Sequence, residues 1–139
     1  MFIQEIDYKI VIGETALKVV TQADQETRAN AELEAVEEIA GYLRPKYDCA
    51  AIFGAEGGNR NRQVLMYACD IALYHMAASL PNKMGMEIRE KRYEMAIKWL
   101  KDVQAGIVIP DLPLATTETG EFAAPSIRFG SKPCIDNSY

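Results

Sequence analysis

The sequence is short of the side chains from which most active sites are built. It has one histidine, His75, and three widely separated cysteines, Cys49, Cys69 and Cys134, with no C-x-x-C pair. A protein zinc site needs several histidine or cysteine ligands in close arrangement, and this set does not have that spacing. An odd, scattered set of cysteines also fits a reducing compartment better than a disulfide framework. We therefore expect no bound metal and no other cofactor.

Long hydrophobic runs and an excess of positive charge are also absent. The first residues, MFIQEIDYK, lack the basic and apolar regions of a signal peptide, and no run approaches the length of a membrane span. Fifteen Lys and Arg against 20 Asp and Glu give a net charge of −5. That charge argues against electrostatic binding to nucleic acid or to an anionic membrane. We expect a protein without a membrane anchor and without sequence-specific nucleic-acid binding.

Helical periodicity is the main structural signal that the sequence does contain. Of its 139 residues 49% are hydrophobic, which is enough for one core. Three segments have the period of long helices, and two shorter helical pieces within residues 3–20 are separated by Gly13. The long segments are residues 24–44, 61–80 and 86–105. The fold class predicted is all-α, a small bundle of about three main helices plus short N-terminal helices, over residues 1–106.

Apolar residues recur at intervals of three and four in these segments, so each helix has one side directed to the core. In the segment 24–44 this stripe contains Leu33 and Val36. The segment 61–80 is apolar almost all round, which is typical of a central helix. The predicted core residues are Leu33, Val36, Leu43, Leu65, Ile71, Tyr93, Ile97 and Leu100.

Residues 48–60, DCAAIFGAEGGNR, form a glycine-rich connection. The Lys-Ser/Thr pair of a phosphate-binding loop is missing, and so is the G-x-G-x-x-G spacing of a dinucleotide site. We predict a flexible turn here.

Negative charge is concentrated in residues 24–43, which hold six acidic side chains and one arginine. Glu34, Glu37 and Glu38 lie opposite the predicted core stripe. A carboxylate metal site is one interpretation of this trio. We favour a solvated acidic face, because exposed carboxylates are common on helix surfaces.

The segment RQVLMYACDIALYHMAASL holds a cysteine, an aspartate and the histidine in an apolar run. On a helix, Cys69 and His75 diverge by about 120° and lie about 9 Å apart along the axis. They cannot converge on one atom without help from other helices. Asp70 has Tyr67 and Tyr74 within helical reach, and an enzyme that uses these side chains is one interpretation of the segment. A buried hydrogen bond is the role we favour for Asp70, and we expect no enzymatic activity.

The last 33 residues, 107–139, differ in character from the rest. They contain four of the six prolines and have no helical period. Their spaced apolar side chains predict an extended C-terminal arm that is buried against a partner, by strand addition or in a groove. The alternative is a floppy tail with one short strand. The predicted partner-binding residues are Ile107, Ile109, Leu112, Leu114, Phe122, Ile127 and Phe129.

Three stretches in this order resemble the Mu-like prophage family of small head-completion or head–tail connector proteins. They are AELEAVEEIAGYLRPKYD, RQVLMYACDIALYHM and REKRYEMAIKWLKDVQAGIVIPDLP, and the resemblance covers roughly residues 2–112. The sequence departs from the family pattern at Lys46, where arginine is commoner, and in the glycine-rich connection, where proline is expected. The matching positions are Gly41, Tyr42, Leu43, Lys46 and Tyr47, then Cys69, Asp70, Ile71, Ala72 and Tyr74, then Arg92, Tyr93, Glu94, Ala96, Trp99, Leu100, Asp102 and Gly106.

The resemblance implies a non-enzymatic structural protein of the virion, assembled in the bacterial cytoplasm. Several copies would form a ring at the portal vertex and join the capsid to the tail. The implied partners are the portal protein, a downstream neck or tail protein, and other copies of the chain. Glu34, Glu37 and Glu38 would line a conduit that repels DNA, and the arm would bind a neighbour or the portal.

An alternative from another class is a small helical protein-binding or ligand-binding regulatory module with no phage role. In that case the grooves between the helices would hold the ligand or partner. Ring formation on a portal separates the two interpretations.

Overall fold

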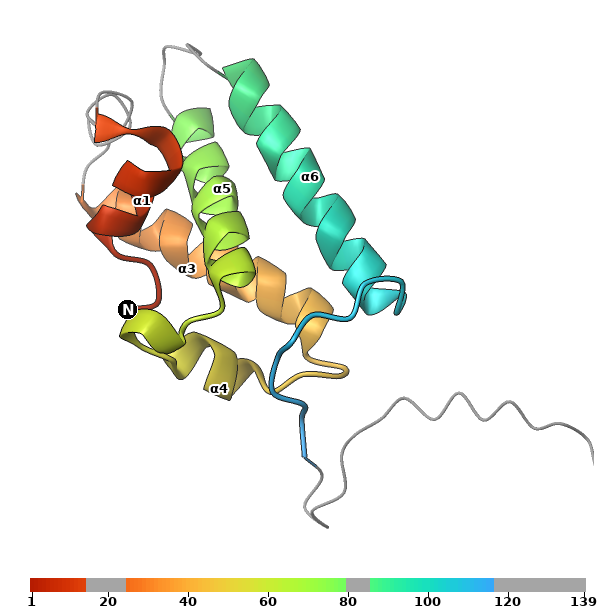
Figure 1. Ribbon diagram of the computed structural model, residues 1–139. Helices are drawn as coiled ribbons and strands as arrows, with labels where there is room; N and C mark the ends of the chain where they lie inside the picture. The colour runs from red at the N-terminus through yellow and green to blue at the C-terminus, as the bar shows by residue number, and fades with distance from the viewer. Residues whose placement is uncertain (15–24, 80–85, 117–139) are drawn as a thin grey trace, which may run out of the picture.

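The computed structural model describes residues 1–14, 25–79 and 86–116, and within these residues the chain is all-α (Figure 1). One isolated bridge pairs Tyr47 with Leu114, and no described segment forms a sheet. The predicted fold class is thereby confirmed. The helices are α1 (Glu5–Ile12), α3 (Gln25–Leu43), α4 (Cys49–Gly54), the 3₁₀ turn η1 (Gly57–Asn59), α5 (Arg62–Ser79) and α6 (Met86–Gln104).

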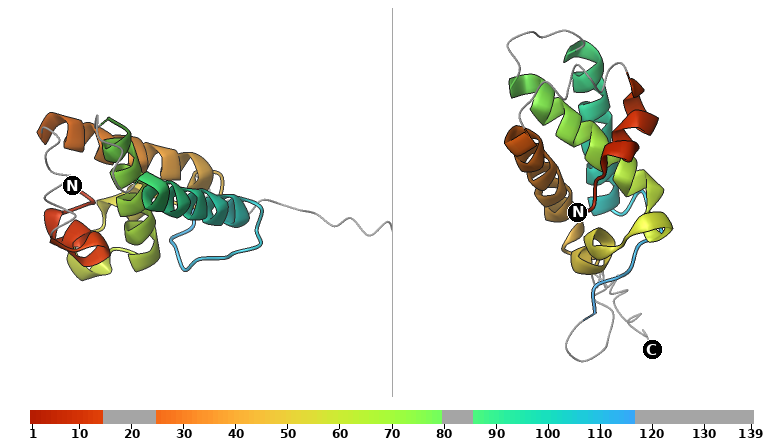
Figure 2. Two further views of the ribbon diagram at one scale, coloured as in Figure 1. Left: turned by 90° about the horizontal axis from the view of Figure 1, so that it is seen from above. Right: turned by 90° about the vertical axis from the view of Figure 1, so that its left-hand side faces the viewer.

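Helix α5 is the centre of the bundle and packs against α3, α6 and α1. Figure 2 shows α3 and α1 on opposite sides of it. Alanines let the three long helices approach closely: Ala35, Ala68, Ala72 and Ala96 are fully buried. The near-uniform apolar character of α5 follows from this position, since a helix with neighbours on three sides has little surface left for water.

Local sequence sets most helix ends near their predicted places. Gly13 and Gly106 have φ of 80° and 78°, a conformation that glycine adopts without a Cβ penalty, and they follow α1 and α6. The predicted N-cap at Asp24 and the predicted helix end at Pro81 and Asn82 lie outside the described residues. So does most of the second short N-terminal piece.

The prediction of a flexible turn over residues 48–60 was wrong, because this segment contains α4 and η1. The Asp48 side chain accepts a hydrogen bond of 3.0 Å from the Ala51 backbone N–H and so caps α4. Ile52 is 3% exposed and anchors the short helix in the core. The glycines are confined to the residues after this anchor, which explains why their abundance was misleading.

Most predicted core residues lie in the core, but Leu33 does not. Leu43, Ile71 and Leu100 are fully buried, and four others are partly buried against the same cluster: Val36, Leu65, Tyr93 and Ile97. Leu33 is 63% exposed, which corrects its assignment. The inward side of α3 is rotated away from Leu33 and contains Ala31, Glu32, Ala35, Ile39, Ala40 and Leu43.

The beginning of the predicted arm returns to the helical part of the chain. The Asp48 N–H donates to the Pro113 carbonyl at 2.9 Å, and the Ala115 N–H donates to the Lys46 carbonyl at 3.0 Å. Leu112 is only 8% exposed and belongs to the core. Leu112 is therefore not available to a partner in this arrangement, contrary to the prediction.

The other arm residues fall into two groups. Ile107, Ile109 and Leu114 are exposed, whereas Phe122, Ile127 and Phe129 lie outside the described residues. Among the described helices, none has the length and apolar character required to cross a membrane.

Candidate functional site

Cys69, Asp70 and His75 are turned toward three different surroundings rather than toward one another. Asp70 is 3% exposed and accepts hydrogen bonds from Arg92 Nε at 2.7 Å and Arg92 Nη2 at 3.2 Å. The carboxylate of Asp70 raises the pKa of Arg92 through the hydrogen bond. Cys69 is fully buried, and burial raises the pKa of its thiol to about 12. Such a thiol is a poor nucleophile at neutral pH.

His75 lies at the junction of α3, α5 and α6, beside Glu38. Its Nε2 is 3.2 Å from Glu38 Oε2, while the Tyr93 hydroxyl donates to Glu38 Oε1 at 2.7 Å. Tyr74 stacks on Tyr93 with 4.2 Å between ring centroids. Burial, followed by the hydrogen bond to Glu38, raises the pKa of Tyr93. Glu38 is thus occupied by this cluster and is not part of a free acidic face, which corrects its assignment.

A second buried ion pair fixes the N-terminal segment. Asp7 accepts from Arg60 at 2.7 and 3.1 Å, and the same guanidinium donates to the Phe2 carbonyl at 2.7 Å. The side chains of Asp7 and Arg60 are 7% and 9% exposed. The pair therefore joins α1 to the turn before α5 across 53 positions of sequence.

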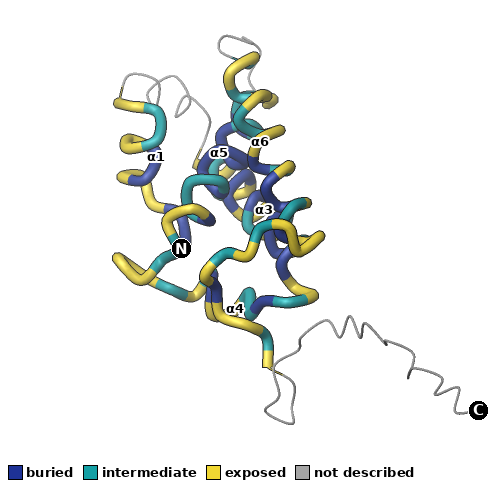
Figure 3. Tube along the Cα trace, turned by 45° about the vertical axis from the view of Figure 1, so that its right-hand side comes forward, coloured by how far each residue is buried: buried dark blue, intermediate teal, exposed yellow. Residues whose placement is uncertain are grey.

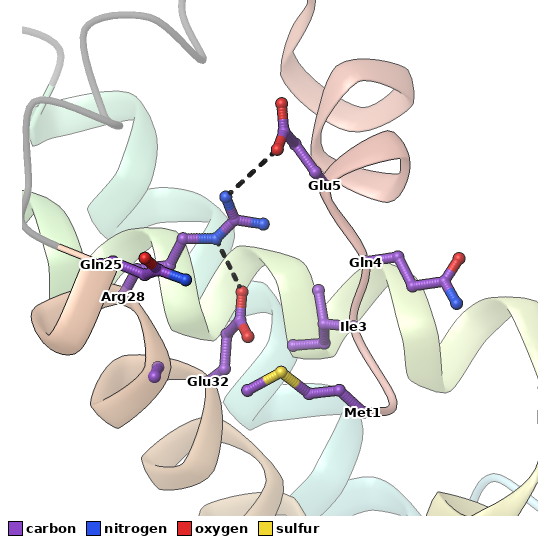
Figure 4. A pocket seen from close by; sticks show the side chains of 8 residues that line it. Met1, Ile3, Gln4, Glu5, Gln25, Arg28 and Glu32 are labelled. Carbon is purple, nitrogen blue, oxygen red and sulfur yellow. Dashed lines mark hydrogen bonds and ion pairs between the residues drawn. The ribbon is translucent and has the colours of Figure 1, made fainter.

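A cavity of about 520 Å³ lies between the N-terminal segment and the first turns of α3 (Figure 4). Arg28 spans it, with Nη1 at 3.7 Å from Glu5 and Nε at 3.0 Å from Glu32. The buried Tyr8 hydroxyl donates to Glu32 at 2.9 Å, and burial, followed by the charge of Glu32, raises the pKa of Tyr8. Met1 and Ile3 supply the apolar lining. The charged groups of this cavity, Glu5, Arg28 and Glu32, are already bound to one another.

A groove of about 570 Å³ lies between α1, α5 and α6 on the side of the bundle away from α3. Its walls include Ile10, Leu65 and Met66, with Arg62 and Arg92 at its edges. Ile10 is 79% exposed. This groove thus combines apolar walls with a cationic rim, and we call it the α1–α5 groove.

The outer side of α3 carries exposed residues that are mostly acidic, with one asparagine and one leucine among them. We call this set the acidic ridge: Glu26, Asn30, Leu33, Glu34 and Glu37. Of its carboxylates, Glu37 pairs with Arg44 at 2.7 Å. Figure 3 shows the contrast between such exposed turns and the middle of α5, which is buried. Glu34 and Glu37 are therefore exposed as predicted.

Three buried acidic residues were not recognised as a set from the sequence: Asp7, Glu32 and Asp70. Glu32 left one signal, since Arg28 precedes it by four positions, the spacing of a helical ion pair. Asp70 left another, its place in an apolar helix, which predicted the buried hydrogen bond but not the partner Arg92, 22 positions away. Asp7 left none, because Arg60 is 53 positions away. Among the described residues no group of three His, Cys, Asp or Glu side chains is arranged to hold a metal ion. This holds for the glutamate trio as well.

The fold and its surfaces define a small all-α protein whose buried acidic side chains, among the described residues, are paired with arginines. A family model described as "Bacteriophage Mu, Gp36" matches residues 3–128. The match covers most of the chain, and the chain belongs to this family of Mu-like phage proteins. No curated protein and no solved structure matches the chain.

Proposed function

We propose that this chain is a structural protein of a Mu-like phage, a head–tail connector or adaptor. Several copies form a ring at the portal vertex and join the capsid to the tail, in a virion assembled in the bacterial cytoplasm. Membership of the Gp36 family over residues 3–128 is the observation that carries the proposal. The proposed partners are the portal protein, a downstream neck or tail protein and further copies of the chain.

The surface near the C-terminal end of the described chain supports a role in binding another protein. Ile107 and Ile109 are 74% and 73% exposed, and Leu114 is 39% exposed. A small domain gains nothing from holding such side chains in water, whereas an interface buries them. We assign the partner-binding role to these three residues and, in the rest of the arm, to Phe122, Ile127 and Phe129.

A non-enzymatic role is part of the proposal. The residues best suited to chemistry are committed to structural contacts: Asp70 to Arg92, Glu38 to Tyr93, and Glu32 to Tyr8. The exposed carboxylates of Glu34 and Glu37 suit two places in a ring. One is the wall of a DNA conduit, and the other is the contact between neighbouring copies.

Co-purification with the portal protein of the same phage tests the proposal. The full-length chain is compared with a variant carrying Phe122→Ser, Ile127→Ser and Phe129→Ser, and with a second variant carrying Ile107→Ser and Ile109→Ser. A stoichiometric complex that either variant loses is the expected result. Because Leu112 belongs to the core, a deletion of the arm should begin after Thr116, so that a folding defect is not mistaken for lost docking.

A second candidate function is favoured by the cavity beside Arg28. A ligand-binding regulatory module with no phage role would use such a space of about 520 Å³. No portal complex for any form of the chain, together with a stable monomer, would move the assignment to this module.

A further inference from the structure

The acidic ridge has the composition of a contact surface rather than of an ordinary solvated face. Leu33 is 63% exposed at its centre, with Asn30 on the preceding turn and Glu34 and Glu37 beside it. Three ridge carboxylates against Arg44 leave an excess of two negative charges. An exposed leucine surrounded by carboxylates is complementary to a partner surface that has an apolar groove and positive charge.

The α1–α5 groove has both an apolar wall and positive charge. Ile10, Val11, Leu65 and Met66 form an apolar wall, and three arginines line or edge the hollow: Arg60, Arg62 and Arg92. Arg60 and Arg92 are neutralised by Asp7 and Asp70. Arg62 is exposed, and no described residue forms an ion pair with it. Three guanidinium groups against two carboxylates therefore leave one positive charge at the rim.

The two surfaces lie on opposite sides of the molecule. Helix α3 contributes no residue to the groove, and Figure 2 shows α5 between α3 and α1. A single copy cannot fill its own groove with its own ridge. Two different, complementary surfaces on opposite sides give a head-to-tail contact, which makes a closed ring when the rotation between copies closes.

We propose that copies of this chain associate in solution through this contact, with the acidic ridge of one copy seated in the α1–α5 groove of the next. Leu33 enters the apolar part of the groove, and Glu34 lies beside Arg62. The inference rests on the proposed function, because it names the surfaces that join the copies of the proposed ring. It also takes Glu34 and Glu37 out of the wall of a DNA conduit.

Charge reversal followed by mixing tests the contact. Glu34→Arg and Arg62→Glu are made separately in the full-length chain, and association is measured by sedimentation over a series of concentrations. Each variant alone should associate at least about tenfold more weakly than the wild type, since like charges then oppose each other. An equimolar mixture should recover association, because the intact groove of one variant meets the intact ridge of the other. The ridge changed by Glu34→Arg can also meet the groove changed by Arg62→Glu, and in that contact the two charges are exchanged but still opposite.

Matched controls separate the contact from general surface effects. Glu94→Arg makes the same charge change at an exposed position of α6 and should leave association unchanged. Leu33→Ser should weaken association, whereas Ile88→Ser, at a residue 60% exposed on α6, should not. Circular dichroism and urea unfolding confirm that each variant is folded.

The remaining outcomes overturn the inference. A groove filled by another protein, or by residues 117–139 of the same chain, predicts that Glu34→Arg has no effect and that mixing restores nothing. A wild-type chain that stays monomeric up to its solubility limit also contradicts the contact. Portal co-purification, run in parallel, separates the two proposals. A portal complex without rescue by mixing supports the connector function and contradicts the ridge–groove contact. Rescue by mixing without a portal complex supports the contact and contradicts the connector function.

Discussion

At the scale of single residues, each buried acidic side chain among the described residues is held by an arginine. Asp7, Glu32 and Asp70 are at most 6% exposed, and each has a guanidinium nitrogen within 3.0 Å. A carboxylate transferred from water into a protein interior without such a partner is strongly destabilising. The Asp7–Arg60 pair therefore holds the N-terminal segment to the turn before α5, and the Asp70–Arg92 pair holds α6 to α5, whereas the Arg28–Glu32 pair lies within α3.

The substitution Asp70→Asn should lower the free energy of unfolding by about 2 kcal/mol, because it removes the charge that Arg92 pairs with. Arg92 is 37% exposed, so water recovers part of the loss. Urea unfolding followed by circular dichroism measures the change. The exposed Glu94→Gln should change the same quantity by less than about 0.5 kcal/mol, and equal values for the two variants would contradict the assignment.

The buried thiol of Cys69 makes stability depend on alkaline pH. Its pKa is raised from 9.0 to about 12, so the folded protein holds the proton more tightly than the unfolded chain does. This contribution is fully present below pH 9.0 and is lost as the pH rises toward about 12. Cys69→Ala should therefore lose less stability than the wild type between neutral pH and that window. Urea unfolding of both proteins at neutral pH and between pH 9.0 and about 12 measures this difference. Equal losses of stability in the two proteins would refute the prediction.

At the scale of elements, the rotation of α3 about its own axis decides what the surface presents. The small side chains of Ala31 and Ala35 are buried, while the larger Leu33 is 63% exposed. This arrangement buries less apolar area per residue than a leucine stripe would, but it lets the helices pack closely. The exposed leucine is then left for the acidic ridge.

The orientation of α3 predicts opposite responses at two of its leucines. Leu43→Ala should lower the free energy of unfolding by about 2 to 5 kcal/mol, since Leu43 is fully buried. Leu33→Ala should change it by about 0.5 kcal/mol or less. Chemical denaturation of both variants gives the comparison. A large loss for Leu33→Ala would mean that α3 is turned the other way.

At the scale of the whole molecule, the chain folds back on itself after α6. Leu112 is buried, and the two backbone hydrogen bonds of Asp48 and Ala115 tie residues 113–115 to the loop before α4. The helical bundle and the first part of the predicted arm therefore share one core. The exposed Ile107 and Ile109 lie between the end of α6 and this anchored segment.

Two deletions should separate the anchored part of the arm from the rest. Ending the chain after Gly106 should lower the free energy of unfolding by about 2 to 4 kcal/mol, through the lost burial of Leu112 and the lost hydrogen bonds. Ending it after Thr116 retains all described contacts and should cost much less. Thermal and urea unfolding compare the two, and equal losses would place the anchor beyond residue 116.

The sequence did not predict the short α4 and η1. By itself it determined α1 and the three long helices, because periodicity and end signals such as Gly13 and Gly106 act within a few residues. It also determined that α5 is central, since its apolar character admits no other place. The tertiary structure alone decided that Glu32 faces inward and Leu33 outward, that Asp70 pairs with Arg92, and that Leu112 belongs to the core. The physical reason is the same in each case. Glu32, Asp70 and Leu112 each pack against, or pair with, a residue on another element that is distant in the sequence. A local sequence pattern carries no information about that distant partner.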